Sequence, residues 1–133
     1  MKAKLAEAFS DYADYHRNET NQRLHAIGIP LIVFGTFGFF GPNYGLLLWL
    51  AVNAWYLSLD ARLGAAFAIV SLGLLYGASG IAGPWLLALF VAGWVIQGVG
   101  HYYEGRSPAF FKNAQHLLIG PLWVLQKYTR LAR

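Results

Sequence analysis

Four histidines are the residues of this 133-residue chain best suited to metal chemistry: His16, His25, His101 and His116. The first two belong to the polar stretch YHRNETNQRLH, after which the chain becomes almost wholly apolar. Neutral imidazole nitrogen binds iron, zinc, copper or nickel. No cysteine is present, which excludes thiolate catalysis and cysteine-ligated zinc or iron–sulfur sites. The first question is therefore which of these histidines can meet.

The composition is typical of a membrane protein. Hydrophobic residues make up 57% of the chain and charged residues only 12%, whereas soluble domains are about one-quarter charged. A helix that crosses a bilayer needs about 20 mostly apolar residues. We therefore predict an all-α fold with one membrane domain over residues 1–133 and four transmembrane helices, at the uncharged runs 24–42, 44–59, 63–82 and 84–102.

Two further helices are expected outside these spans. Leu5, Phe9, Tyr12 and His16 recur at the spacing of one helical face, which predicts an N-terminal amphipathic helix that lies along the membrane surface or caps the bundle. The segment 113–128 is apolar enough to form a C-terminal interfacial or re-entrant helix. Its central Pro121 disfavours a regular fifth span.

A break in the chain decides whether the first two histidines can meet. In one unbroken helix a separation of nine residues is about 900°, which would put His16 and His25 on opposite sides. Asn18, Thr20 and Asn21 are residues that favour helix N-caps and turns. We therefore predict a turn here and a first span that begins near Asn21, so that both imidazoles can face one point.

The positions of Lys and Arg predict an orientation. Short cytoplasmic loops carry an excess of these residues; the N-terminal region and the connectors 60–62 and 106–112 contain them, whereas 41–45 and 79–84 do not. This alternation fits four spans with both termini in the cytoplasm. Topology and anionic lipid also account for the net charge of +4 better than nucleic acid does.

This orientation brings His16, His25 and His101 to one depth, from three helices, as a predicted metal site. Ionisable groups at membrane depth are costly and tend to mark functional cavities. Glu104 follows His101 by three residues and could add a carboxylate ligand. Histidines and a carboxylate with open positions are the ligands of non-haem Fe(II) oxygenases. The alternative for Glu104 is an interfacial ion pair with Arg106 or Arg23.

Three amides are candidates to support these ligands. Asn18, Asn21 and Gln97 can accept a hydrogen bond from the second N–H of a ligand imidazole and so fix its tautomer. Gln97 precedes His101 by four residues and therefore shares its helical face. Capping and interhelical hydrogen bonds are the alternative for Asn18 and Gln97. For His116 we expect an interfacial or structural role.

Small residues predict where membrane helices approach closely. Gly73 and Gly77 form a GxxxG pair, and further small surfaces come from Gly35, Gly38, Gly93 and Gly100. The pattern predicts tight packing and no particular function.

Three motifs in order, YHRNETNQRLH, GHYYEGRSPAF and LLIGPLWVL, cover nearly the whole chain. Through them the sequence resembles a family of small membrane proteins whose fungal member is a 2-hydroxy fatty acid dioxygenase of phytosphingosine breakdown. The resemblance implies an Fe(2+)- and O2-dependent α-oxidation, in which a 2-hydroxy fatty acid loses its carboxyl carbon. It also implies that His16, His25, His101 and Asn21 belong to the site.

The expected partners follow from that chemistry: a 2-hydroxy fatty acid, O2 and membrane lipid. An amphiphilic acid would keep its head at the interface and its tail in the bilayer. Trp94 and Tyr102 are candidates to line a groove for the acyl chain, and Arg23 or Arg106 to offset the charge of the substrate. A homo-oligomer is left open, and a bacterial inner membrane fits the short chain.

Two other functions remain open at this stage. Two histidines of neighbouring helices could be axial ligands of haem in a membrane electron carrier. Alternatively, the chain could be a non-catalytic four-span transporter or assembly subunit, with the histidines in a proton path or scaffold.

Overall fold

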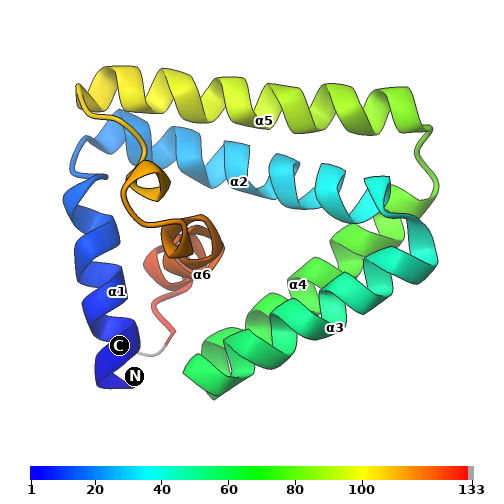
Figure 1. Cartoon of the computed structure of the whole chain (residues 1–133), viewed down its shortest axis with the longest axis horizontal. Coiled ribbons are helices and arrows are strands. Elements are labelled where there is room, and N and C mark those ends of the chain that lie inside the picture. The colour runs from blue at the N-terminus through cyan, green and yellow to red at the C-terminus, as the bar shows by residue number, and fades with distance from the viewer. Residues whose placement is uncertain (132–133) are drawn as a thin grey trace.

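The structure is a computed structural model that describes residues 1–131, and it is all-helical over that range (Figure 1). The predicted all-α class is therefore confirmed. The elements are α1 (Ala3–Asp14), α2 (Glu19–Phe39), α3 (Gly41–Leu59), α4 (Ala61–Ser79), α5 (Gly83–Glu104), the short 3-10 helix η1 (Ala109–Phe111) and α6 (Gln115–Thr129).

Helices α2 and α5 lie side by side along the longest dimension of the molecule, and the α3–α4 hairpin leaves their far end at an angle (Figure 1). Helix α1 extends away from the N-terminal end of α2 at an angle, on the same side as α6 (Figure 1). The segment after α5 brings α6 into the space between α1 and the hairpin (Figure 1). The ends of α2 and α5 that carry His25 and His101 therefore lie beside α1.

Glycines allow α2 and α5 to pack closely. A Cβ added at Gly28 would lie 2.9 Å from the Gly93 carbonyl oxygen, and one added at Gly93 would lie 2.8 Å from the Gly28 carbonyl oxygen. Two turns closer to the histidines, a Cβ at Gly100 would collide with the side-chain oxygen of Asn21. Only glycine lets the two backbones approach this far, a device that is common in tightly packed membrane helices.

The predicted GxxxG pair does not make such a contact within the chain. A Cβ at Gly73 would meet open space, and one at Gly77 would make only an ordinary contact with Phe34. The prediction of close packing was right for Gly35, Gly38, Gly93 and Gly100 and wrong for this pair. The pair faces outward because α4 contacts its neighbours through other residues, including Leu63, Phe67 and Ser71.

Helix α6 lies at the centre of the hydrophobic core rather than at its edge. Ile119 and Leu122 are almost fully buried, and they pack in one cluster with Leu5 and Phe9 of α1 and Leu63 of α4. The sequence predicted an interfacial or re-entrant helix here, whereas the structure has a regular helix that continues through Pro121. The buried face of α1 is the predicted one, and α1 uses it to cover α6.

Among residues 1–131, two helices, α4 and α5, are long and apolar enough to cross a membrane. The other two predicted spans do form helices, α2 and α3, of 21 and 19 residues. These fall short of the same criterion because α2 begins with five polar residues and α3 contains two asparagines and a serine. Four spans are therefore not confirmed.

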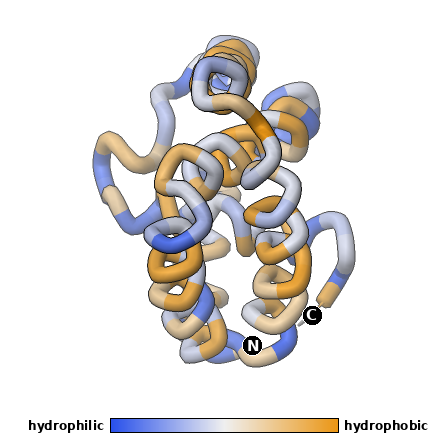
Figure 2. Tube along the Cα trace, turned by 90° about the vertical axis from the view of Figure 1, so that its right-hand side faces the viewer, coloured by the Kyte–Doolittle hydropathy of each residue, from blue (hydrophilic) through white to orange (hydrophobic). Residues whose placement is uncertain are grey.

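The outer surface is nonetheless strongly apolar. Large side chains on successive helices point outward, with Leu47 63%, Ile69 74% and Val95 59% exposed. Hydrophobic residues run along the helices, and hydrophilic residues gather near their ends (Figure 2). Exposed apolar surface of this extent indicates contact with lipid or with another protein.

Candidate metal centre

A turn between α1 and α2 brings His16 back towards His25. Helix α1 ends at Asp14, and Asn18 caps α2 by accepting a hydrogen bond from the Asn21 backbone N–H at 3.1 Å. The predicted break is therefore confirmed, together with the alternative role of Asn18 as a cap. The turn places the Nε2 atoms of the two imidazoles 3.0 Å apart.

Three buried imidazoles meet at this point. His16, His25 and His101 are only 2%, 2% and 6% exposed, and their ring centroids lie 4.4 to 5.0 Å from one another. One nitrogen from each ring lies within 4.8 Å of the other two, a spacing at which the three can bind one metal ion. The ligand group therefore draws on the turn before α2, on α2 itself and on the last turn of α5.

The second nitrogen of each ring is held by a backbone carbonyl. Nδ1 lies 2.7 Å from the Tyr12 oxygen in His16, 2.9 Å from the Asn21 oxygen in His25, and 3.1 Å from the Arg106 oxygen in His101. A carbonyl only accepts, so each Nδ1 carries the proton and donates it. Each Nε2 is then left with a free lone pair, which is the form of histidine that binds metals.

The Nε2 atoms of His16 and His25, each with a free lone pair, lie 3.0 Å apart, and this separation fits a bound metal ion. Two acceptors at that distance repel each other unless a cation or a proton lies between them. Burial lowers the pKa of His16 to about 4, even though its bond to the Tyr12 carbonyl raises it. Protonation is therefore disfavoured at neutral pH, and a metal ion satisfies the donor set better.

The geometry does not bring Glu104 into this group. Its carboxylate accepts from the backbone N–H of Arg17 at 2.9 Å, from that of Asn18 at 2.8 Å and from the Asn21 amide at 3.0 Å. Neither the predicted ligation nor the alternative ion pair appears. Instead Glu104, at the end of α5, holds the turn that carries His16 in place through these hydrogen bonds.

Replacing Glu104 by glutamine is expected to loosen this turn. The amide group of Gln would face N–H donors with only one acceptor oxygen, and charge-assisted bonds would be lost. We expect the free energy of unfolding to fall by about 1–2 kcal/mol, together with weaker metal binding because His16 is no longer held. Thermal unfolding and metal titration measure both effects.

Glu19→Gln is the matched control for that variant. Glu19 forms an exposed ion pair with Arg23, 78% and 71% exposed, and surface pairs contribute little. If Glu104→Gln changed stability and metal binding as little as this control does, Glu104 would not hold the turn in place.

The amide candidates take different positions. Asn21 is fully buried and contacts His25 through its backbone carbonyl, while its side chain bonds to Glu104. Gln97 does not accept from His101, because Nδ1 of that ring bonds to the Arg106 carbonyl instead. His116 is 6% exposed and packs beside Tyr12 rather than at an interface, outside the metal group.

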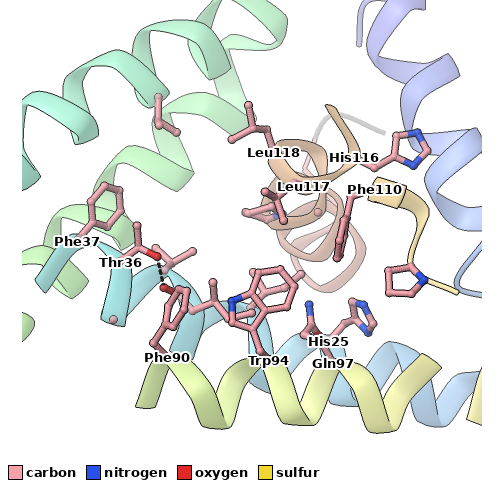
Figure 3. Close-up of a pocket in the computed structure, with 18 of the residues that line it drawn as sticks. His25, Thr36, Phe37, Phe90, Trp94, Gln97, Phe110, His116, Leu117 and Leu118 are labelled. Carbon is pink, nitrogen blue, oxygen red and sulfur yellow. Dashed lines mark hydrogen bonds between the residues drawn. The ribbon is translucent and has the colours of Figure 1, made fainter. Parts of the chain in front are cut away.

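An apolar cavity of about 720 Å³ opens beside the three imidazoles. Its walls come from α2, α5, the α3–α4 hairpin and the η1–α6 segment, and Figure 3 shows Phe90, Trp94 and Phe110 projecting into it. Trp94 lines it as expected, whereas Tyr102 is 83% exposed and does not. Its volume is in the range of small-molecule sites, about 300–1,000 Å³.

No Lys, Arg, Asp or Glu lines this cavity within residues 1–131. Arg23 pairs with Glu19 at the surface. Arg106 lies 3.8 Å above the ring of Tyr15 and belongs to a separate polar pocket. Neither of the arginines expected to offset the charge of a substrate therefore does so from the cavity wall.

Comparison with known proteins shows the family of the chain. Residues 2–131 match the family model described as 2-hydroxy-palmitic acid dioxygenase Mpo1-like. The chain belongs to this family. No curated protein and no solved structure matches the chain. The family description names a dioxygenase of 2-hydroxy-palmitic acid. The three histidines that meet in the structure lie within the matched range.

Sequence reasoning missed two features of this Mpo1-like site. The backbone carbonyls that fix the imidazole tautomers leave no trace in residue type, although the four-residue spacings from Tyr12 to His16 and from Asn21 to His25 are compatible with such bonds. The Tyr12 side chain was assigned only to a buried face, yet its ring stacks on His16 with centroids 4.0 Å apart. That same spacing was the signal available for this contact.

Proposed function

We propose that this protein is an Fe(II)-dependent dioxygenase that shortens 2-hydroxy fatty acids by one carbon. The observation that carries the proposal is the convergence of three buried imidazoles, each with a ring nitrogen within 4.8 Å of the other two, in the wall of an apolar cavity. Imidazole is a suitable ligand for iron. The family description supplies the substrate class.

His16, His25 and His101 would hold the iron, and the three backbone carbonyls would keep their lone pairs directed at it. When bound, iron supplies the positive charge that offsets the substrate carboxylate and the redox chemistry needed for O2. The overall reaction balances without a further reductant: R–CH(OH)–COOH and O2 give R–COOH, CO2 and H2O. The protein therefore needs no second cofactor for this conversion.

The cavity would hold the acyl chain. On α2 its lining runs from His25 to Phe39, which is roughly 21 Å of helix at 1.5 Å per residue. Aliphatic and aromatic side chains cover most of that length, so they would exclude water from the reacting end. A polar head at the histidines and an apolar tail along α2 and α5 match an amphiphilic acid.

We further propose that helices α2 to α5 lie in a membrane, with the His25 end of α2, the His101 end of α5 and both termini on the cytoplasmic side. The exposed aliphatic side chains of α3 to α5 support contact with lipid. The distribution of Lys and Arg supports the orientation. A bacterial inner membrane is consistent with both, and the substrate would then enter from the lipid.

The haem alternative is disfavoured by the same distances. A planar macrocycle between two axial ligands needs room that a separation of 3.0 Å between the His16 and His25 nitrogens does not leave. The third imidazole, with its centroid within 5.0 Å of both rings, occupies the remaining side. A Soret band in the purified protein would restore the haem alternative.

Incubation of the iron-loaded protein in lipid nanodiscs with 2-hydroxypalmitate, labelled with ¹³C at the carboxyl carbon, tests the proposal. We expect pentadecanoate and labelled CO2, formed only when O2 is present. His101→Ala is expected to abolish both products. Formation of the products at an equal rate by this variant, or no products from the iron-loaded protein, would refute the proposal.

A further inference from the structure

Within residues 1–131, three polar side chains that line the cavity have an atom without a hydrogen-bond partner: Tyr12, Gln97 and, on α6, His116, whose Nδ1 is buried. Gln97 is 9% exposed, and its Oε1 is buried with no hydrogen-bond partner. Tyr12 is 5% exposed, and within residues 1–131 it makes its polar contacts through its backbone carbonyl and not through its hydroxyl. An unpaired buried polar group is costly, so such groups indicate a ligand or water.

The Tyr12 hydroxyl lies about one helical turn further into the cavity than the three imidazoles. A Cβ added at Gly120 of α6 would lie 2.9 Å from this hydroxyl and 3.4 Å from Cδ1 of Ile29. Ile29 follows His25 by four residues, and one turn of helix is 3.6 residues. Because Gly120 has no side chain, the Tyr12 hydroxyl has room there, near Ile29 and one turn of α2 beyond His25.

Gln97 lies at the same depth on the opposite helix. It precedes His101 by four residues, and a Cβ at Gly28, three residues after His25, would lie 3.0 Å from Gln97 Oε1. Figure 3 shows its side chain rising from α5 into the cavity next to His25. Tyr12 and Gln97 thus form a polar level between the imidazoles and the rest of the cavity.

Beyond this level the wall offers no further free polar side chain of this kind on α2. Ile32 and Val33 follow, and the hydroxyl of Thr36 already donates to the Ile32 carbonyl at 2.7 Å. The cavity therefore changes from imidazoles, to two unpaired polar groups, to an apolar stretch. A ligand that matches it is polar at its end, polar at the next position and apolar after that.

We propose that Tyr12 and Gln97 recognise the hydroxyl on C2 of the substrate and select 2-hydroxy acids over unsubstituted fatty acids. This inference rests on the proposed function, which places the carboxylate at the histidines. A hydroxyl both donates and accepts, so it can bond to a phenol and to an amide together. An unsubstituted acid would put a methylene there and leave both protein groups unpaired, which sites of this kind reject strongly.

Binding without turnover tests this selection. Zinc binds to histidine but has no redox chemistry, so zinc-loaded protein in nanodiscs can be titrated with 2-hydroxypalmitate and with palmitate. We expect the wild type to bind the hydroxy acid at least about tenfold more tightly. Tyr12→Phe, which keeps the ring on His16, and Gln97→Leu should each lose most of that preference by weakening only the hydroxy acid.

Thr36→Val is the matched control, because its hydroxyl lines the cavity but is already bonded to the chain. It should keep the wild-type preference, and zinc content should be unchanged in every variant. If Gln97→Leu or Tyr12→Phe loses zinc, Gly120→Ala is the replacement variant. It places a methyl group against the Tyr12 hydroxyl and should also lower the preference for the hydroxy acid.

The outcomes separate this inference from the proposed function. A wild type that prefers the hydroxy acid, with variants that keep the same preference, would overturn the role of Tyr12 and Gln97 alone. A zinc-loaded wild type that binds neither acid would overturn the proposed substrate class as well.

Discussion

His25→Ala is expected to lose its iron and, with it, the shortening of 2-hydroxy fatty acids. The substitution leaves two imidazoles where three converge, and His25 is the one whose Nε2 lies 3.0 Å from that of His16. Loss of a group that only supports a metal ligand costs about 10–100-fold in affinity. Loss of a ligand should therefore weaken iron binding by more than about 100-fold.

Anaerobic metal titration of the variant measures this loss, with the rate of pentadecanoate formation followed on the same samples. His116→Ala is the matched control, because His116 is also buried but lies outside the group of three histidines. We expect the control to bind iron as the wild type does. Equal iron affinity in His25→Ala and the wild type would show that the three histidines are not the metal site.

Gly100→Ala is expected to disturb the centre without touching a ligand. Its Cβ would collide with the side-chain oxygen of Asn21, which is fully buried and tied to Glu104. Overpacking of this kind costs about 1–3 kcal/mol, against a gain of about 1 kcal/mol for alanine over glycine in a helix. We expect a net loss of stability and a lower iron affinity, since Asn21 also holds His25.

Gly98→Ala separates the collision from the change in helix propensity. This glycine lies two residues away on the same helix, and a Cβ there would meet no atom within 4 Å. It should be neutral or slightly stabilising and should bind iron normally. Thermal unfolding and iron titration of the two variants side by side decide the matter, and equal behaviour would contradict the role of Gly100 in seating α5 on α2.

The grouping of the three histidines could be predicted because it depends on local signals. Asn18 and Asn21 mark a turn through their own side-chain chemistry, and that turn is sufficient to reverse the chain between His16 and His25. His101 ends an apolar run whose length and direction follow from the pattern of charges. Helix periodicity and capping are encoded within a few residues, so they are visible in a single sequence.

Features that depend on contacts between distant segments were not visible. The three-residue spacing from His101 to Glu104 is compatible with ligation, but the carboxylate is captured by backbone donors of Arg17 and Asn18, more than 80 positions earlier. The sequence records neither donor, because every residue except proline has a backbone N–H. The same holds for the carbonyls that fix the tautomers.

The prediction of where α6 lies was wrong for a related reason. Its apolar face suits an interface and a protein core equally well, and Pro121 suggested a break. Only the arrangement of α1 and the α3–α4 hairpin shows that Ile119 and Leu122 are needed to fill the space between them. Glycines behave similarly: Gly73 and Gly77 have the better-known spacing, yet the close approach is made by Gly28, Gly93 and Gly100.

The most direct test of the account is an iron titration of metal-free protein in nanodiscs, followed by the rate of pentadecanoate formation from 2-hydroxypalmitate under O2. We expect no product without iron, a linear rise with added Fe(II), and a plateau at about one iron per chain, as three converging imidazoles require. Full activity in metal-free protein, or a plateau that His16, His25 and His101 variants share, would contradict it.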